Sequence, residues 1–154
     1  MLLRELRWYQ DEALAKGLPH PGFALFMEQR TGKCLTTLAF VDKRKPPILF
    51  IVTKKRGVKV WKDEIKKSLK FDWKCKVIIT YFQELHNYRK HWREYFRKHG
   101  ADIFIVCDES HTIKRRGSQP ARTVRYLGSQ AAYRLALTGT PLQPRLYGDR
   151  KSVV

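Results

Sequence analysis

Three short motifs in this sequence contain residues that can bind phosphate, hold a divalent cation and activate water. In the first, "EQRTGK" (28–33), Gly32 and Lys33 precede a helical run. The free N–H groups and the positive dipole end of a helix favour a phosphate there, and Lys33 could reach the β and γ phosphates of a nucleotide. The motif is weak by itself, because the full phosphate-loop pattern has a glycine six residues before the lysine, where this chain has Met27.

The second motif, "DESH" (108–111), places two carboxylates directly after the apolar run "IFIVC". Mg²⁺ prefers hard carboxylate oxygen and bridges phosphates, so Asp108 is a candidate metal ligand. Glu109 beside it could orient and deprotonate an attacking water. The alternative, an acidic turn, is less attractive for two acids at the end of an apolar strand in a basic chain. His111 alone is a weak candidate, and within the motif we expect it to link this site to the next one.

The third motif, "LTGTP" (137–141), offers the hydroxyl groups of Thr138 and Thr140 around the flexible Gly139. Read by itself, it is an ordinary turn. Its meaning therefore depends on whether the fold brings the three motifs to one place.

Five short apolar runs are spaced along the chain, and each is typical of a strand buried on both faces. They are 23–27, 48–52, 77–81, 103–107 and 134–138. The three motifs each follow one of these runs. Because ligands bind at the carboxyl ends of the strands in open parallel sheets, we expect the motifs to meet at that edge.

Between the strands, two apolar stripes have the spacing of core-facing helices. The first consists of Val58, Trp61, Ile65 and Leu69, and the second of Leu85, Tyr88, Trp92 and Phe96. We interpret the aromatic residues of both stripes as packing residues. Alternating strands and helices predict an α/β fold, a three-layer domain with a mainly parallel sheet and helices on both faces.

The strongest compositional feature is a net charge of +18, from 32 Lys and Arg residues against 14 acids. This excess favours a polyanionic partner over the alternative of a merely soluble basic surface. Nucleic acid is the favoured partner, but charge alone does not distinguish DNA from RNA or from an anionic membrane. No apolar run is long enough to span a membrane. The three widely spaced cysteines form no disulfide or zinc pattern, so we expect a cytoplasmic protein.

Taken together, the order and spacing of the motifs resemble the N-terminal RecA-like motor domain of superfamily 2 helicases and translocases of the Swi/Snf type. The resemblance covers about residues 4–147, and "DESH" and "LTGTPLQ" are similar to motifs II and III of that family. "LRWYQ" resembles the Q motif, "EQRTGKC" motif I, "ILFIVTKKRGVKVWKDEI" motif Ia and "IITYFQEL" motif Ib. The compact motif spacing suits a prokaryotic or phage motor.

This resemblance implies ATP and Mg²⁺ as cofactors and DNA as the partner. The implied nucleotide-binding residues are Gln10, which would contact adenine, and Arg30, Thr31, Gly32, Lys33 and Cys34. The implied catalytic residues are Lys33, Asp108 and Glu109, with Asp108 holding the metal. Coupling between nucleotide and DNA would involve His111, Thr138, Gly139 and Thr140. Nucleic-acid contacts would come from Lys54, Lys55, Arg56, Thr80 and Lys114.

Two residues depart from the usual motif I, E-x-G-x-G-K-T. Arg30 replaces the first glycine, which the loop tolerates only if its φ stays negative or the strain is absorbed elsewhere. Cys34 replaces a hydroxyl that is a hard ligand for Mg²⁺, and a thiol is a poor match. Thr37 lies about 4.5 Å further along the helix axis, away from the phosphates. We therefore expect ATP to bind, with weakened Mg²⁺ affinity and turnover.

The domain is expected to span residues 1–148. Residues 149–154, "DRKSVV", are expected to be a non-native or disordered tail, because one choice of codons spells part of a sequencing adapter; a genuine polar tail is the alternative. We expect this chain to lack the second RecA-like domain of such motors, and therefore to bind ATP weakly and hydrolyse little or none by itself. A basic nucleic-acid-binding module with a vestigial phosphate loop remains the second interpretation, and a small-molecule kinase is disfavoured.

Overall fold

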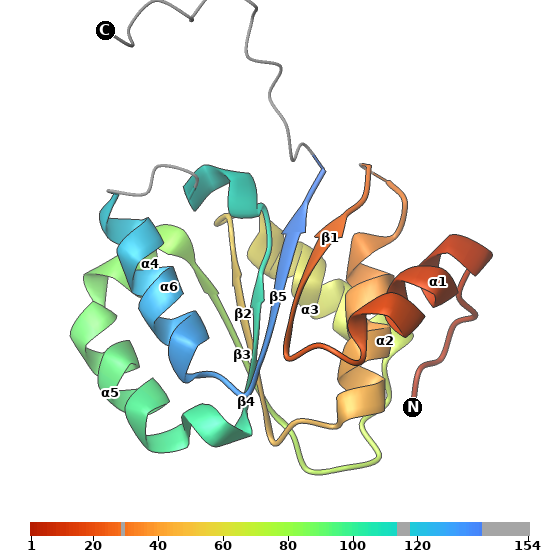
Figure 1. Cartoon of the computed structure of the whole chain (residues 1–154), viewed down its shortest axis with the longest axis horizontal. Coiled ribbons are helices and arrows are strands. Elements are labelled where there is room, and N and C mark those ends of the chain that lie inside the picture. Colours follow the sequence, from red (N-terminus) through yellow and green to blue (C-terminus); the bar gives the residue numbers. More distant parts are fainter. Residues whose placement is uncertain (29, 114–117, 140–154) are drawn as a thin grey trace, which may run out of the picture.

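A sheet of five parallel strands forms the centre of the computed structural model, which describes residues 1–28, 30–113 and 118–139. The strands are β1 (Gly22–Phe26), β2 (Ile48–Thr53), β3 (Lys76–Tyr81), β4 (Ile103–Cys107) and β5 (Tyr133–Thr138). Their order across the sheet is β1-β5-β4-β2-β3 (Figure 1). The predicted strand positions are confirmed to within one residue at each end.

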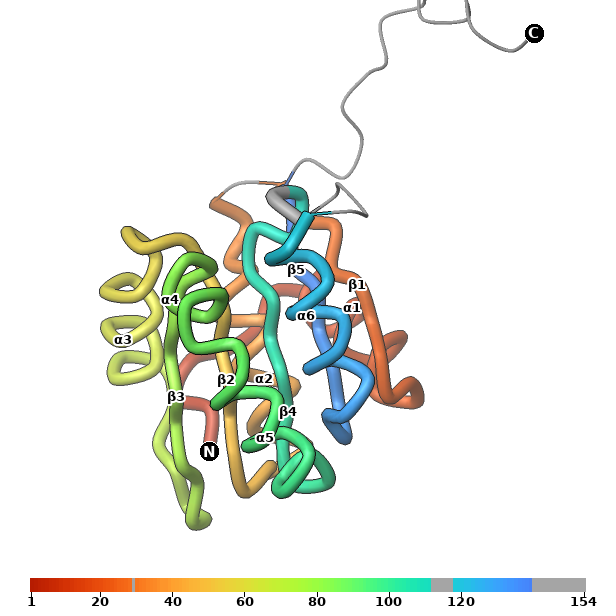
Figure 2. Tube along the Cα trace, turned by 90° about the vertical axis from the view of Figure 1, so that its left-hand side faces the viewer, coloured from red at the N-terminus to blue at the C-terminus, as the bar shows by residue number. Residues whose placement is uncertain are grey.

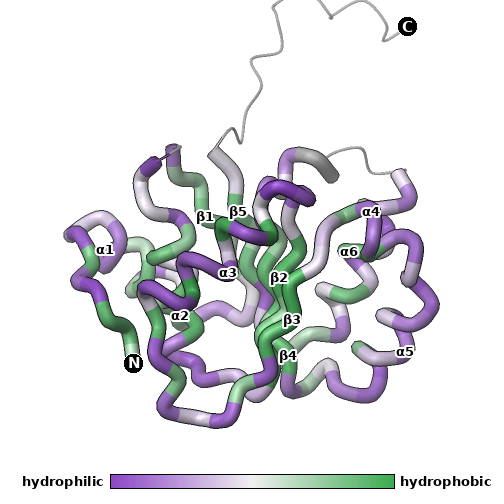
Figure 3. The backbone as a smooth tube through the Cα atoms, turned by 180° about the vertical axis from the view of Figure 1, so that it is seen from behind, coloured by the Kyte–Doolittle hydropathy of each residue, from purple (hydrophilic) through white to green (hydrophobic). Residues whose placement is uncertain are grey.

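Two of the five strands, β2 and β4, are buried on both faces, as their continuous apolar sequences predict, whereas β1, β3 and β5 also contain half-buried or exposed residues. Every residue of β2 and of β4 is buried. Hydrophobic residues follow the strands through the middle of the molecule, while the outward sides of the helices are polar (Figure 3). A parallel sheet requires helices on both faces to cover such strands.

Helices cover the two faces of the sheet in two groups (Figures 1 and 2). The first group is α1 (Trp8–Gly17), α2 (Lys33–Arg44) and α3 (Gly57–Ser68). The second is α4 (Phe82–Asn87), α5 (Arg89–His99) and α6 (Gln119–Gln130), with short 3₁₀ turns η1 (Gly100–Asp102) and η2 (Ser110–Ile113). Each group packs its buried side chains into a separate apolar core on its own face of the sheet. This is the three-layer α/β arrangement that the sequence predicts. None of the described helices is long and apolar enough to cross a bilayer.

The second predicted helical stripe is wrong in one respect, because the helix breaks at Tyr88. The backbone of Tyr88 has φ −105° and ψ 27°, so α4 ends before it and α5 begins after it. Leu85 and Phe96 are fully buried, and Trp92 packs edge-on against Phe50, whereas Tyr88 is 61% exposed. The break lets two short helices follow the sheet surface and leaves the residue at their joint outside.

The helix α6 was not predicted, although its start carries a recognisable signal. Ser118 has an extended backbone and its hydroxyl accepts a hydrogen bond from the Ala121 N–H, and Pro120 lies in the first turn. A serine cap followed by proline is typical of a helix N-terminus.

The break at Tyr88 leads to a prediction about stability. Phe96→Ala should lower the free energy of unfolding by about 3–5 kcal/mol, because it empties a fully buried site. Tyr88→Ala should change it by only about 0.5 kcal/mol. Urea denaturation followed by circular dichroism measures both. Equal losses would show that Tyr88 belongs to a continuous buried stripe.

Candidate functional site

The three motifs lie together at the carboxyl edge of the sheet. The loop with Lys33 follows β1, the acidic pair follows β4, and Thr138 is the last residue of β5. Phe26 pairs with Thr138 across β1 and β5, which places the first and third motifs at adjacent strand ends (Figure 1). The fold therefore brings the three motifs to one edge of the sheet, as expected from the sequence.

Gly32 and Gln10 together fix the shape of the loop. Gly32 has φ +83°, and a Cβ atom there would lie 2.4 Å from the Gln10 amide nitrogen. That amide donates to the carbonyl oxygens of Thr31 and Gly32 at 3.1 and 3.3 Å, and the Gln10 oxygen accepts from the Arg7 N–H. Only 2% of Gln10 is exposed, so its predicted contact with adenine would require these bonds to rearrange.

The Lys33 ammonium lies inside the loop. Its Nζ atom is 3.1 Å from the carbonyl oxygen of Met27 and 3.3 Å from that of Glu28. The helix α2 begins at Lys33 without a side-chain cap, so its first N–H groups are available to an anion. A cleft of about 390 Å³ lies between this loop and the segment that leads into α1. Phosphate oxygens entering it could replace the two carbonyls as partners of Lys33.

Arg30 adopts a left-handed backbone. Its φ is +65°, whereas a non-glycine residue fits this loop without strain only if its φ is negative. Left-handed φ costs a residue with a side chain about 1–2 kcal/mol. The loop therefore carries strain at the position where the family pattern has glycine.

Neither Cys34 nor Thr37 provides a hard oxygen for a metal. Burial, with a smaller effect of the Asp108 carboxylate, raises the pKa of the Cys34 thiol to about 12, so the group stays a neutral thiol at physiological pH. The Thr37 hydroxyl is buried and donates to the Lys33 carbonyl oxygen at 2.8 Å. Because neither residue can act as a metal ligand here, the carboxylates of the second motif are the candidate metal ligands.

The Asp108 carboxylate is held by donors from three segments. Its Oδ2 atom accepts from the Thr53 hydroxyl and from the Trp61 indole N–H, both at 3.0 Å. Its Oδ1 atom accepts from the Glu109 N–H at 2.9 Å. The sequence did not reveal Thr53 or this use of Trp61, because their spacing marks a strand end and a packing stripe.

Glu109 connects the acidic pair to β2 and β5. Its Oε2 atom lies 3.5 Å from Lys54 Nζ and 3.2 Å from His111 Nε2. His111 Nδ1 in turn lies 3.2 Å from the Thr138 hydroxyl. Glu109 has φ +57°, so this carboxylate also stands on a strained backbone. The predicted link through His111 to the third motif is thus present in the geometry.

The acidic pair suits Mg²⁺ held jointly with phosphates. Within the described ranges, no group of three or more His, Cys, Asp or Glu residues could hold a metal by itself. Mg²⁺ commonly takes one or two carboxylates and completes its shell with substrate phosphates and water. Asp108 is the residue that would hold it here, with Glu109 adjacent.

The predicted nucleic-acid residues fall into three groups. Lys54, Lys55 and Arg56 follow β2 at the same edge, and Lys55 lies over the ring of Tyr81. Thr80 is buried and donates to Glu84 at 2.8 Å, so a phosphate contact would require this segment to open. Lys114 lies outside the described residues.

Of the residues predicted to couple nucleotide and DNA binding, Thr140 also lies outside the described residues, whereas Gly139 follows β5 and is half-buried. The expected tail 149–154 lies outside the described residues as well.

The strain at Arg30 predicts that Arg30→Gly stabilises the protein by about 1 kcal/mol, since glycine adopts φ +65° without a steric cost. The control is Arg97→Gly within α5, which should lose about 1 kcal/mol. Urea denaturation measures both. A loss of stability in Arg30→Gly would contradict the strained loop.

The neutral thiol predicts that Cys34→Thr strengthens Mg²⁺-dependent nucleotide binding. Threonine supplies the hard oxygen that Cys34 lacks, and a tenfold tighter complex corresponds to about 1.4 kcal/mol. Titration of mant-ATP with and without MgCl₂ measures the effect, with Cys75→Thr as the control. Identical Mg²⁺ dependence in Cys34→Thr and wild type would exclude a role for this position.

Comparison with known proteins identifies a family and a similar solved structure. The sequence profile of the SNF2-related domain matches residues 19–147. Among solved structures, the chain is similar to the Sulfolobus solfataricus SWI2/SNF2 ATPase core in complex with dsDNA, with a TM-score of 0.73 and 25% identity. The match covers 94% of this chain and 34% of that one, so the chain spans about a third of its length. A search of curated proteins finds no match.

The structural match extends over nearly the whole chain and includes the RecA-like sheet that carries the three motifs. The family profile covers well over half of the sequence. The chain therefore belongs to the SNF2-related domain family, with the α/β fold of the N-terminal, RecA-like half of a Swi/Snf-type motor.

Proposed function

We propose that this chain is the ATP-binding half of an ATP-dependent DNA translocase or helicase that completes its active site with a second RecA-like domain of the same parent protein. The observation that supports this most strongly is the continuous set of contacts from Lys54 through Glu109 and His111 to Thr138. These contacts join the acidic pair to the basic segment after β2 and to the third motif. Such a motor needs its nucleotide site to communicate with its DNA contacts.

In this proposal, each residue at the edge has a defined task. Lys33 and the first N–H groups of α2 bind the phosphates, and Asp108 holds the cation. Mg²⁺, when bound, neutralises charge on the phosphates. Glu109 orients water and accepts its proton, while His111 holds the Glu109 carboxylate at 3.2 Å. With one domain alone, we expect nucleotide binding with little hydrolysis.

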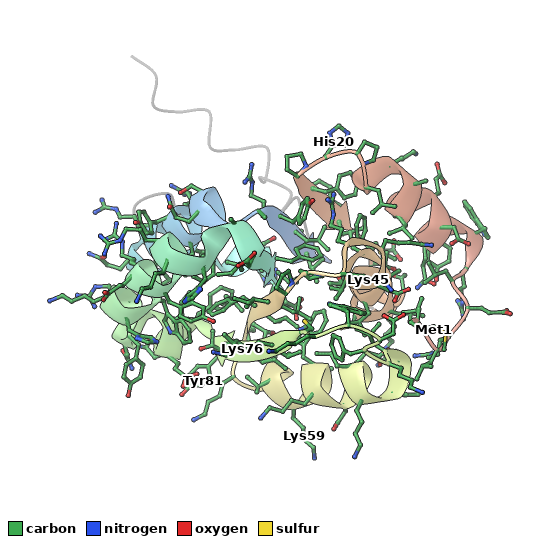
Figure 4. All side chains as sticks on the ribbon, turned by 90° about the horizontal axis from the view of Figure 1, so that it is seen from below. Met1, His20, Lys45, Lys59, Lys76 and Tyr81 are labelled. Atoms are coloured by element: carbon green, nitrogen blue, oxygen red, sulfur yellow. The ribbon has the colours of Figure 1, made fainter. Side chains whose placement is uncertain are left out.

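DNA is the proposed partner, for two reasons. The net charge of +18 favours a polyanion, and the similar Sulfolobus solfataricus structure is described as a complex with dsDNA. The basic residues Lys54, Lys55 and Arg56 follow β2. On the next helix, α3, Lys59 points away from the protein (Figure 4). RNA remains compatible with the same charge, since phosphate contacts alone do not distinguish the two.

A second candidate function is a basic nucleic-acid-binding module whose phosphate loop no longer supports turnover. The left-handed Arg30 and the neutral Cys34 thiol favour it. The intact acidic pair, Asp108 and Glu109, with its hydrogen bonds and its contact with His111, favours the first candidate, the ATP-binding half of a motor. The two candidates differ in whether nucleotide and DNA binding influence each other.

Removal of the Lys33 ammonium group tests the nucleotide site. Lys33→Ala should weaken mant-ATP binding by about 10-fold to 100-fold, because it removes charge-assisted bonds worth about 1.5–3 kcal/mol. Lys43→Ala, in the last turn of the same helix, is the matched control. Both variants should bind a fluorescent DNA duplex like wild type at equal salt. Unchanged mant-ATP affinity in Lys33→Ala would contradict the proposed function.

A further inference from the structure

The indole N–H of Trp61 is directed at the candidate metal ligand. Trp61 is fully buried on α3, and a buried indole N–H usually has a hydrogen-bond partner. Two other tryptophans differ in their partners. Trp73 donates to the Pro46 carbonyl oxygen at 2.9 Å, and the buried Trp92 Nε1 atom has no partner among the described residues. The buried position thus does not by itself dictate a carboxylate as partner for Trp61.

The junction between β2 and α3 places a second donor on the same oxygen atom. Thr53, 1% exposed, donates to Asp108 Oδ2 at 3.0 Å, as Trp61 does. Gly57, the first residue of α3, makes room for this hydroxyl. A Cβ atom at position 57 would lie 2.3 Å from Thr53 Oγ1. The strand end, the glycine and the indole therefore act together to define the orientation of one carboxylate.

We propose that Trp61 and Thr53 are positioning residues that orient the Asp108 carboxylate for Mg²⁺. They occupy Oδ2, whereas Oδ1 accepts, among the described residues, the Glu109 N–H and keeps further lone-pair capacity for a cation. This inference rests on the proposed function, because the orientation of Asp108 matters to chemistry only if Mg²⁺–nucleotide binds. It adds two residues that act through Asp108 and do not touch the nucleotide.

Two uncharged donors suit this task. Hydrogen bonds to a carboxylate are stronger than those between neutral groups, so two of them can fix its rotation without forming an ion pair that would compete with the cation. Partners that orient a metal ligand typically affect metal affinity by about 10-fold to 100-fold when removed. A purely structural role predicts a different outcome: lower stability with an unchanged Mg²⁺ requirement.

The test is an MgCl₂ titration of mant-ATP binding. Trp61→Phe and Thr53→Val each remove one donor and keep an apolar side chain in place. Both should raise the half-saturating Mg²⁺ concentration by about 10-fold to 100-fold, while mant-ATP binding in EDTA stays at the wild-type level. Thr53→Ser, which keeps the hydroxyl, should restore wild-type Mg²⁺ dependence. Trp73→Phe, which removes an indole N–H away from the site, should leave it unchanged.

The outcomes separate this inference from the proposed function. If wild type binds no mant-ATP, the two fall together. If wild type shows Mg²⁺-dependent binding and both donor variants titrate identically to it, the positioning role is wrong and the proposed function stands.

A spectroscopic experiment keeps the test valid if Trp61→Phe fails to fold. The indole ¹H–¹⁵N signals of the protein can be assigned by elimination with Trp8→Phe, Trp73→Phe and Trp92→Phe. Asp108→Asn should then shift the Trp61 indole signal and leave the Trp73 signal in place. An unmoved Trp61 signal would show that its N–H does not bind Asp108 and would overturn the inference.

Discussion

The carboxyl edge of the sheet is organised around the hydrogen-bonded carboxylate of Asp108. A half-buried carboxylate needs donors to replace water, and here they come from the end of β2, from α3 and from the next residue of its own loop. Because β2 and β4 are neighbours in the sheet, Thr53 and Asp108 meet as soon as the strands pair. The neighbouring Glu109 is then directed toward Lys54 and His111, which connects the edge to β5 through Thr138.

The loop after β1 has its own internal contacts. Gln10 holds the backbone around Gly32, and Lys33 is bonded to carbonyl oxygens of the same loop. Two of the non-glycine residues with positive φ, Arg30 and Glu109, belong to this edge. Strained backbone at a ligand site is retained when the surrounding contacts determine it, and it is relieved or used when the ligand binds. The positive φ values thus agree with a binding role for this edge, independently of any family resemblance.

Much of the fold could be predicted from the sequence, since continuous apolar runs buried on both faces leave few alternatives to a parallel sheet. The position of the acidic pair at the carboxyl edge of the sheet could also be predicted, because the pair directly follows an apolar strand sequence. What could not be predicted was pairing at a distance. Trp61 lies in a packing stripe, and nothing in its spacing shows that its N–H reaches a carboxylate 47 residues later. The break at Tyr88 and the buried amide of Gln10 depend in the same way on contacts between segments.

If the proposed function is correct, nucleotide and DNA influence each other's binding through this edge. The most direct measurement is the Kd for a short fluorescent duplex at fixed ionic strength, without nucleotide and with saturating Mg²⁺–ATP, together with the reciprocal ATP titration. We expect each ligand to change the affinity of the protein for the other by the same factor, on the order of 5-fold or more. A DNA affinity that stays the same with bound ATP would contradict this expectation and would leave a basic module that binds the two ligands independently.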